Sequence, residues 1–287
     1  MAERLSDLSA QIESVRQLEA VVTAMRGIAA SRAQSGRTLL PGIDAYAWVV
    51  SRAIGAALNL IPGEGDGSPS PPDRAKRRSL VLFCAEQGFV GAFSERVLDR
   101  ATGVPPETTL LLVGTRGAML ARERAMAPAW TSPMATSAAA VPHLASRLAE
   151  TLYARISNDG LAFVDMVYSR TAASGGIEIE RRSLLPLDFG QFRRPIERRI
   201  PLTNLAPSRL LARLASEYVF AQLCQAAMLA FEAENEARML AMGAARTNID
   251  AKLDTLHRRE RQYRQQEITA EILELATGAD ALMRGRK

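Results

Sequence analysis

The chain has 287 residues, of which 47% are hydrophobic and 23% are charged, the usual balance of a soluble globular protein of one or two domains. Its net charge of +5 permits an acidic partner, but arginines spread over long helical faces are usually only solvated, so charge alone does not indicate a nucleic-acid-binding protein. The most membrane-like stretch, Ala45 to Ile61, is interrupted by Arg52 and is shorter than the ~20 apolar residues that a membrane-spanning helix needs. The N-terminus has no signal-peptide pattern, so we expect membrane association through partners only.

The first predicted element is a helix from about Ala2 to Leu60. Its apolar residues recur at steps of three and four, which is typical of one buried stripe. We expect Pro41 and Gly42 to break or kink it. The stripe consists of Leu5, Leu8, Ile12, Val15, Val22, Met25 and Ala29.

A linker rich in glycine, proline and serine follows at residues 63–72, and the hydrophobic period then changes. Short apolar runs at 79–84, 110–113 and 161–168 predict buried strands. Helical patterns lie between them, at about 92–102, 118–126 and 141–156. This alternation predicts a small Rossmann-like α/β domain with a parallel sheet, and the alternating residues 177–180 are a candidate edge strand.

The last predicted element is one unbroken helix from about Leu210 to Leu282, which at ~1.5 Å per residue is about 110 Å long. A helix of that length needs a partner to bury its apolar stripe. We therefore predict an α/β fold in which the N- and C-terminal helices form a long antiparallel coiled coil around the inserted domain. The expected parts are 1–61, 74–206 and 207–287. The coiled-coil positions expected on the last helix are Cys224, Met228, Phe231, Met239, Met242, Ala245, Ile249, Leu253 and Leu256, then Ile268, Ile272, Leu275, Ala279 and Leu282.

No catalytic constellation is visible in the chain. The two histidines, His143 and His257, lie in separate helical patterns and not at metal-ligand spacing, and there is no P-loop motif. The sequence therefore predicts no catalytic residue, no metal site and no cofactor. The two cysteines, Cys84 and Cys224, are expected to be buried free thiols.

Three segments of the last helix resemble one family. Residues 234–248 (ENEARMLAMGAARTN) are similar to the SE-x-x-ARM-x-AM-x-AA-x-x-N signature of gamma subunits of F-type ATP synthases. Residues 264–274 (RQQEITAEILE) and 278–282 (GADAL) resemble that family's next two motifs at the family's spacing. In the first helix, residues 14–15 and 24–32 (AMRGIAASR) resemble its SV and AM-x-x-VAASK motifs.

The inserted domain resembles the family more weakly. Residues 86–94 (EQGFVGAFS) take the place of DRGLCGGFN, and residues 113–117 and 167–170 resemble GRKG and VYN-x-F. Two lysines expected between the motifs of the first helix are replaced by Ala20 and Thr23. The Asp-Arg pair of the loop is replaced by Glu86 and Gln87. These departures indicate a divergent branch of the family. One hypothesis is that the chain belongs to a second, alternative F-type ATPase, and a more specific version is that this ATPase transports sodium ions.

The resemblance implies a function and a set of partners. It implies a central rotor shaft that couples transmembrane ion flow to conformational change in a hexamer of alpha and beta subunits, with an epsilon subunit and a ring of c subunits as further partners. It also implies a non-catalytic subunit, peripheral to the cytoplasmic side of a bacterial inner membrane. By resemblance, the residues that contact the beta subunits are Met25, Arg26, Arg264, Gln265, Thr269, Glu271 and Glu274.

Two alternatives remain open at this stage. A coiled-coil scaffold that binds nucleic acid or another protein assembly would use the arginines at 258–264 and predicts salt-sensitive binding. An enzyme built on the inserted domain would require turnover by the chain alone, which the residue inventory disfavours.

Overall fold

The computed structural model describes residues 2–61, 77–193 and 202–284; the side chains of 2–4, 274 and 276–284 lie outside the description. The chain forms two compact units, Met1–Ile28 with Met239–Lys287 and Ala29–Arg238. In chain order the elements are α1 (Ala2–Leu58), β1 (Arg77–Phe83), α2 (Phe93–Asp99), β2 (Thr109–Val113), α3 (Thr115–Glu123), β3 (Trp130–Ser132), α4 (Val141–Asp159), β4 (Leu161–Thr171), β5 (Ile177–Leu185) and α5 (Pro207–Arg284).

The two long helices are present as predicted, with one exception in α1. We expected Pro41 to break or kink the first helix, and this was wrong as regards a break, because α1 continues through Pro41 to Leu58. Proline removes one backbone hydrogen bond and crowds the preceding turn. Leu40 and Ile43, on either side of it, pack against the core, and this packing holds the helix together.

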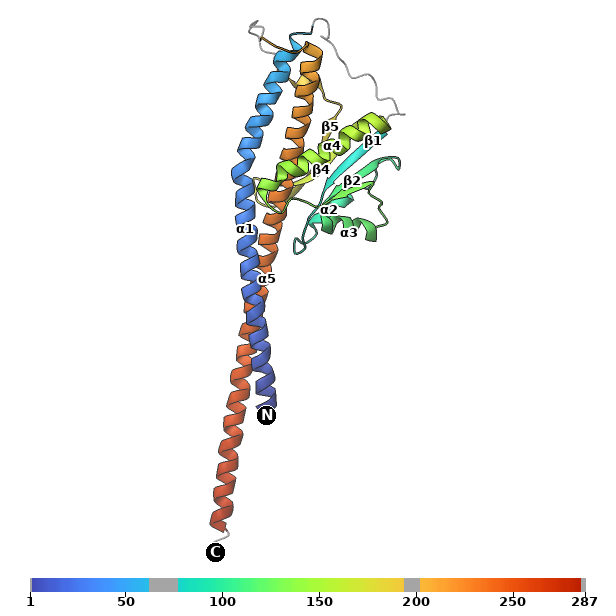
Figure 1. Ribbon diagram of the computed structural model, residues 1–287. Coiled ribbons are helices and arrows are strands. Elements are labelled where there is room, and N and C mark those ends of the chain that lie inside the picture. Colours follow the sequence, from blue (N-terminus) through green and yellow to red (C-terminus); the bar gives the residue numbers. More distant parts are fainter. Residues whose placement is uncertain (1, 62–76, 194–201, 285–287) are drawn as a thin grey trace. The chain divides into compact units, whose positions relative to one another are not determined.

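The first unit is a pair of antiparallel helices (Figure 1). Leu8 and Ile12 of α1 pack with Leu256 of α5, while Val22 packs with Met242 and Ile249 further along. Residues near the start of α1 therefore pack against residues further along α5, as an antiparallel coiled coil requires. Past Leu256 the described side chains of α5 are mostly exposed, because α1 no longer lies beside them.

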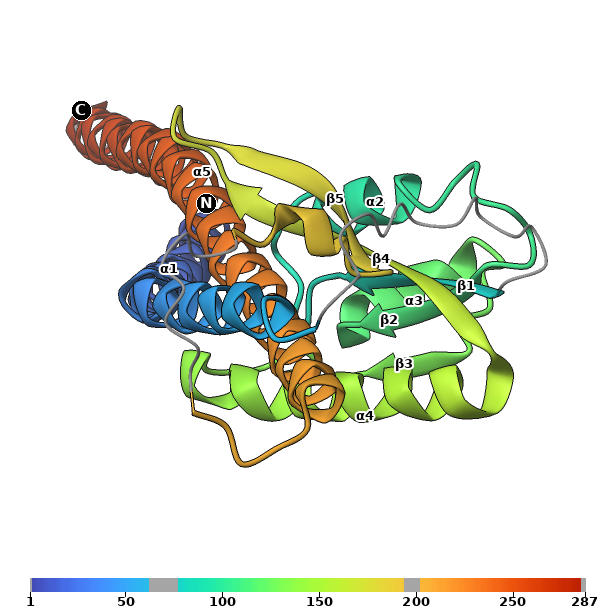
Figure 2. The same ribbon diagram turned by 90° about the horizontal axis from the view of Figure 1, so that it is seen from above.

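The second unit holds a five-stranded sheet in the order β3-β2-β1-β4-β5 (Figure 2). β1, β2, β3 and β4 are parallel, while β5 pairs antiparallel with β4 at the edge. The sheet is thus mixed, and the predicted edge strand runs from Ile177 on to Leu185. Sequence patterns missed β3, which has only three residues.

The sheet is covered on both faces. Along β1, Val81 and Phe83 join a core made with α4 and α5, whereas Leu80 and Leu82 join a second core made with α2 and α3. This period of two is what a strand buried on both faces requires. The result is a three-layer α/β arrangement.

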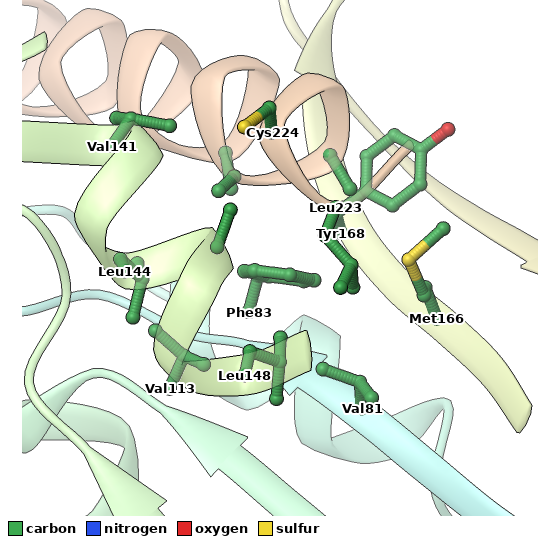
Figure 3. Close-up of a cluster of buried hydrophobic side chains, with 14 of the residues drawn as sticks. Val81, Phe83, Val113, Val141, Leu144, Leu148, Met166, Tyr168, Leu223 and Cys224 are labelled. Atoms are coloured by element: carbon green, nitrogen blue, oxygen red, sulfur yellow. The ribbon is translucent and has the colours of Figure 1, made fainter. Parts of the chain in front are cut away.

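Part of the predicted coiled-coil stripe belongs to the first of these cores. Figure 3 shows Cys224 and Leu223 of α5 beside Phe83 of β1 and Leu148 of α4. Cys224 and Met228 were expected in the contact with α1, and they also pack in this sheet core, which Leu40 and Ile43 of α1 adjoin. In this stretch α5 is apolar on two sides, one for α1 and one for the sheet, and spacing alone did not separate them.

One helix in the described part of the chain is long and apolar enough to cross a membrane. It is a window of α5 with mean hydropathy 1.2, and 61% of that window is buried in the protein. Buried core helices meet the same criterion, so the window carries no membrane assignment.

Candidate partner-contact site

The predicted contact residues of α1 lie in the first unit. Met25 is half-buried and packs against the cluster of Val22, Met242 and Ile249, and Arg26 is exposed beside it. Met25 therefore combines an internal packing role with a partly open surface. Arg26 is directed to solvent and is available to a partner.

The predicted contact residues of α5 are exposed. The Arg264 side chain is 62% exposed, and its Nη2 donates to Glu260 Oε1 at 3.0 Å one turn earlier. Thr269 donates its hydroxyl to the backbone oxygen of Gln265 at 2.8 Å. Glu271 is exposed. The Glu274 side chain lies outside the described residues.

The structure does not bring these two groups of residues together. Met25 packs at the level of Met242, and Arg264 follows Met242 by about 33 Å along the helix axis at ~1.5 Å per residue. A single small partner could not touch both groups. A partner that contacts both groups must extend over this distance along the helix axis.

Exposed apolar residues accompany both groups, and spacing patterns did not single out those of α1. Leu18, Val21 and Ile28 are 52%, 54% and 55% exposed and lie on one side of that helix with Met25. On α5, Ile268, Ile272, Leu273 and Leu275 are also exposed. Contiguous exposed apolar surface usually marks an interaction site.

A guanidinium lies where the family resemblance places a lysine. Thr23 replaces one of the expected lysines of α1, and Arg246 of α5 donates from Nη1 to its hydroxyl at 3.0 Å. Arg246 also pairs with Glu19 at 3.2 Å and lies near Asp250. The positive charge lost from one helix is thus supplied by the other, although two carboxylates partly neutralise it.

Part of the signature at 234–248 is buried. Glu234 accepts hydrogen bonds from the backbone nitrogens of Glu86 and Gln87, and Arg238 donates to the backbone oxygens of Gln87 and Gly88. The two side chains pair with each other, and each is 5% exposed. These signature residues therefore hold the loop after β1 against α5, a role that sequence analysis did not predict.

Glu86 holds the same loop from the other side. Its carboxylate accepts from the backbone nitrogen and hydroxyl of Thr115, at 3.0 and 2.7 Å, and from the backbone nitrogen of Met134 at 2.7 Å. The glutamate that stands in place of the expected aspartate is thus used structurally. It ties β1, the start of α3 and the segment after β3 together.

The described residues contain no group of three His, Cys, Asp or Glu side chains placed to hold a metal ion. An open hollow of about 380 Å³ lies between the loop after β1 and α3, and its charged lining residues are Glu95 and Arg116. Ser94 also lines it, and its hydroxyl oxygen accepts from the backbone nitrogen of Ala85 at 3.1 Å.

Comparison with known proteins gives a consistent result. A family model described as ATP synthase matches residues 4–282. The ATP synthase gamma chain of Clavibacter sepedonicus is 27% identical over 296 residues, covering 98% of this chain and 99% of the relative. That of Kineococcus radiotolerans is 29% identical over 301 residues, covering 98% of each.

Solved structures share the fold. A chain from the OSCP/F1/c-ring part of the Euglena gracilis mitochondrial ATP synthase, in rotational state 3, is 14% identical with a TM-score of 0.69, covering 100% of this chain and 97% of that one. A chain from the rotor of the same enzyme, in rotational state 1, is 12% identical with a TM-score of 0.65, covering 93% of this chain and all of that one.

Proposed function

Because the chain belongs to the gamma-chain family of ATP synthases, we propose that it acts as the central rotor shaft, coupling transmembrane ion flow to conformational change at the catalytic sites of a hexamer of alpha and beta subunits. The shaft itself is non-catalytic in this proposal. Its work is mechanical, since an asymmetric helix pair that turns inside the hexamer presents a different face to each beta subunit in turn.

One observation carries the proposal. Past Leu256, α5 continues without α1 beside it and exposes Ile268, Ile272 and Leu275, the last of them 74% exposed. A single helix in water gains nothing from such a stripe and is only marginally stable. A surrounding protein sleeve would cover it, as the cavity of a hexamer does.

The exposed polar residues then have defined tasks. Arg264 and Gln265 would make directional hydrogen bonds to loops of the beta subunits, and Thr269, Glu271 and Glu274 would extend that surface along the helix. Met25 and Arg26 would form the second contact, about 33 Å away along the coil. Contacts of this kind can be broken and remade as the shaft turns.

The remaining partners follow from the same assignment. We place the inserted domain, residues 74–206, with the adjoining parts of the terminal segments 1–61 and 207–287, against an epsilon subunit and the ring of c subunits. The chain would then be peripheral to the cytoplasmic face of a bacterial inner membrane and held there by those partners.

Purification of the tagged chain from its native membranes at low salt tests the function. Recovery of alpha, beta and epsilon subunits, identified by mass, together with ATP hydrolysis is the expected result. Recovery of the chain alone, or with nucleic acid and no such subunits, would support the scaffold alternative and overturn the proposal.

The double substitution Arg264→Ala with Gln265→Ala tests the contact residues. ATP-driven ion pumping in membrane vesicles should fall while the isolated chain keeps its unfolding transition, because both side chains are exposed and the ion pair of Arg264 with Glu260 spans a single helical turn. The matched control is Arg261→Ala with Gln262→Ala, the same chemistry three residues earlier. Equal pumping in the two double variants would refute the assignment.

A further inference from the structure

Glu232 of α5 bridges two other elements of the second unit. Its Oε1 accepts from Arg37 Nε of α1 at 2.9 Å, and its Oε2 accepts from the hydroxyl of Thr171, at the end of β4, at 2.7 Å. Arg37 also pairs with Glu236. One carboxylate on α5 therefore binds the partner helix and the sheet at the same time.

Gln225 of α5 makes a second bridge of the same kind. Its Nε2 donates to Asp44 Oδ1 of α1 at 2.7 Å, and its Oε1 accepts from Arg182 Nη1 of β5 at 3.2 Å. The amide thus connects α1 to β5 through α5, as the carboxylate connects α1 to β4. Figure 2 shows the β4–β5 hairpin beside α5.

The two bridges lie in line with each other. Gln225 and Glu232 are seven residues apart on α5, and their partners Arg37 and Asp44 are seven apart on α1, in the opposite order. Seven residues are about two helical turns, so each pair shares one face of its helix. We call these two bridges, with their six residues, the bridging seam.

The seam is tightest at Glu232, which is 5% exposed. A buried carboxylate is costly unless it is paired and hydrogen-bonded, and both of its oxygens are used here. Burial by itself would lower the pKa of Arg37, but the hydrogen bonds and charges of Glu232 and Glu236 outweigh it and raise that pKa. A Cβ added to Gly36 would lie 3.2 Å from Glu232 Cβ, so α1 and α5 are in close contact at this level.

Beside the polar contacts of Glu234 and Arg238 with the loop after β1, α5 packs on the sheet through apolar residues such as Leu223, Ala227 and Phe231. Apolar contact is not directional, so by itself it resists sliding or rolling of a helix only weakly. Hydrogen bonds to charged groups are directional and stronger. Single polar positions in coiled coils are known to set register.

We propose that the bridging seam fixes the rotational position of the helix pair against the β4–β5 hairpin, so that force applied to the sheet domain turns the coil. This rests on the proposed rotor function and names Glu232 and Gln225 as positioning residues for it. None of the six residues belongs to the contact set that the family resemblance implies.

The test replaces both central side chains with apolar ones of similar length, Gln225→Met and Glu232→Met, in the full chain. The matched control is Arg181→Met, which removes a hairpin ion pair to Asp165 whose two partners both lie within the sheet. Spin labels on cysteines introduced at the exposed positions Ala45 of α1 and Ser183 of β5 report the distance between coil and hairpin. Cys84 and Cys224 are buried and will not take the label in the folded chain.

The unsubstituted chain and the control should give one narrow distance distribution, and the double Met variant a broader or shifted one. Glu232→Gln alone keeps one acceptor oxygen for Arg37, and its NH2 group can donate to the hydroxyl oxygen of Thr171, so this variant should stay close to the unsubstituted chain. It remains informative if the double variant does not fold. In the assembled complex, the double variant should pump fewer ions per ATP hydrolysed, and the control should not.

An unchanged distance distribution in the double variant would overturn the proposal, and so would unchanged pumping per ATP. A different result would show that the proposed rotor function itself is wrong. The unsubstituted chain would then fail to support ATP hydrolysis with alpha and beta subunits, whatever the labels report.

Discussion

Arg238 and Glu234 are almost wholly removed from water, and each depends on the other and on the loop after β1 for its hydrogen bonds. Replacing one partner of a buried pair leaves the other charge unpaired, which costs more than the pair contributes. Arg238→Ala should therefore lower the free energy of unfolding by about 3–5 kcal/mol, measured by urea unfolding of the full chain.

The exposed pair Arg124–Asp99 gives the comparison for that change. Its side chains are 35% and 60% exposed, so Arg124→Ala should cost only about 0–1 kcal/mol. Equal losses for the two variants would mean that the loop after β1 does not depend on α5 for its position.

Two buried thiols make stability depend on alkaline pH. Burial raises the pKa of Cys224 to about 11 and that of Cys84 further, while an unfolded thiol has a pKa of about 8.5. Above about pH 8.5 the unfolded chain therefore releases protons that the folded chain keeps. The contribution of the protonated thiols to the free energy of unfolding is fully present below about pH 8.5 and is lost as the pH rises. For Cys224 this loss extends from about pH 8.5 to about pH 11.

Urea unfolding at a series of pH values from 7 to about 10 measures the effect. Each thiol should lower the free energy of unfolding by up to about 1.4 kcal/mol per pH unit above pH 8.5. Cys224→Ala should reduce the slope of the free energy of unfolding against pH by the contribution of one thiol. A slope that does not change in this variant would show that Cys224 titrates alike in both states.

At the scale of the element, two glycines of α1 give opposite expectations. Gly42 has open space around the position of a Cβ, so Gly42→Ala should stabilise the chain by about 1 kcal/mol through helix propensity alone. Gly36→Ala would place its Cβ 3.2 Å from Glu232 Cβ, so Glu232 would have to shift by a few tenths of an ångström against the hydrogen bonds that hold its carboxylate. It should therefore destabilise the chain despite the same gain in propensity.

Thermal unfolding of the two variants side by side tests this pair. The melting temperature should rise for Gly42→Ala and fall for Gly36→Ala. Stabilisation by both would show that α1 and α5 can move apart at Glu232 without loss, and the bridging seam would then not be tight.

The helices and most strands could be predicted from sequence because their signals are local. The spacing in α5 and the apolar run of β1 each lie within one short window. β3 escaped notice because three residues carry no period, and the antiparallel direction of β5 is not encoded in its own alternation. The contact of Glu232 with Thr171 joins residues 61 positions apart, so no local pattern could predict it.

In the candidate site, too, some features could be predicted from local sequence and others could not. Residues 257–267 (HRRERQYRQQE) are polar on all sides, so the exposure of Arg264 and Gln265 could be predicted from the sequence. The burial of Glu234 and Arg238 could not be predicted, because the signature at 234–248 contains both buried and exposed positions. Which positions are buried depends on where the loop after β1 packs in the folded chain. The family resemblance placed Glu234 and Arg238 within a signature but did not indicate that they hold the loop after β1.

At the scale of the whole molecule, the chain exposes surface that a partner should cover. The segment 257–273 of α5 is mostly exposed and carries arginines at 258, 259, 261 and 264, each a trypsin site. A lone helix segment opens easily, since little tertiary packing supports it. In the isolated chain trypsin should therefore cut first in this segment, well before it cuts within the sheet of the second unit.

In the assembled complex, trypsin should no longer cut the 257–273 segment first. If a hexamer encloses α5, the same arginines become protected in the purified complex, and hydrogen exchange of the segment should slow together with its cleavage. Mass analysis of the fragments from the free and assembled chain makes the comparison, with cleavage at exposed arginines of the second unit such as Arg122 as the internal reference. Equal cleavage of the segment in both forms would mean that the stripe of Ile268, Ile272 and Leu275 stays uncovered, and the shaft would need another location.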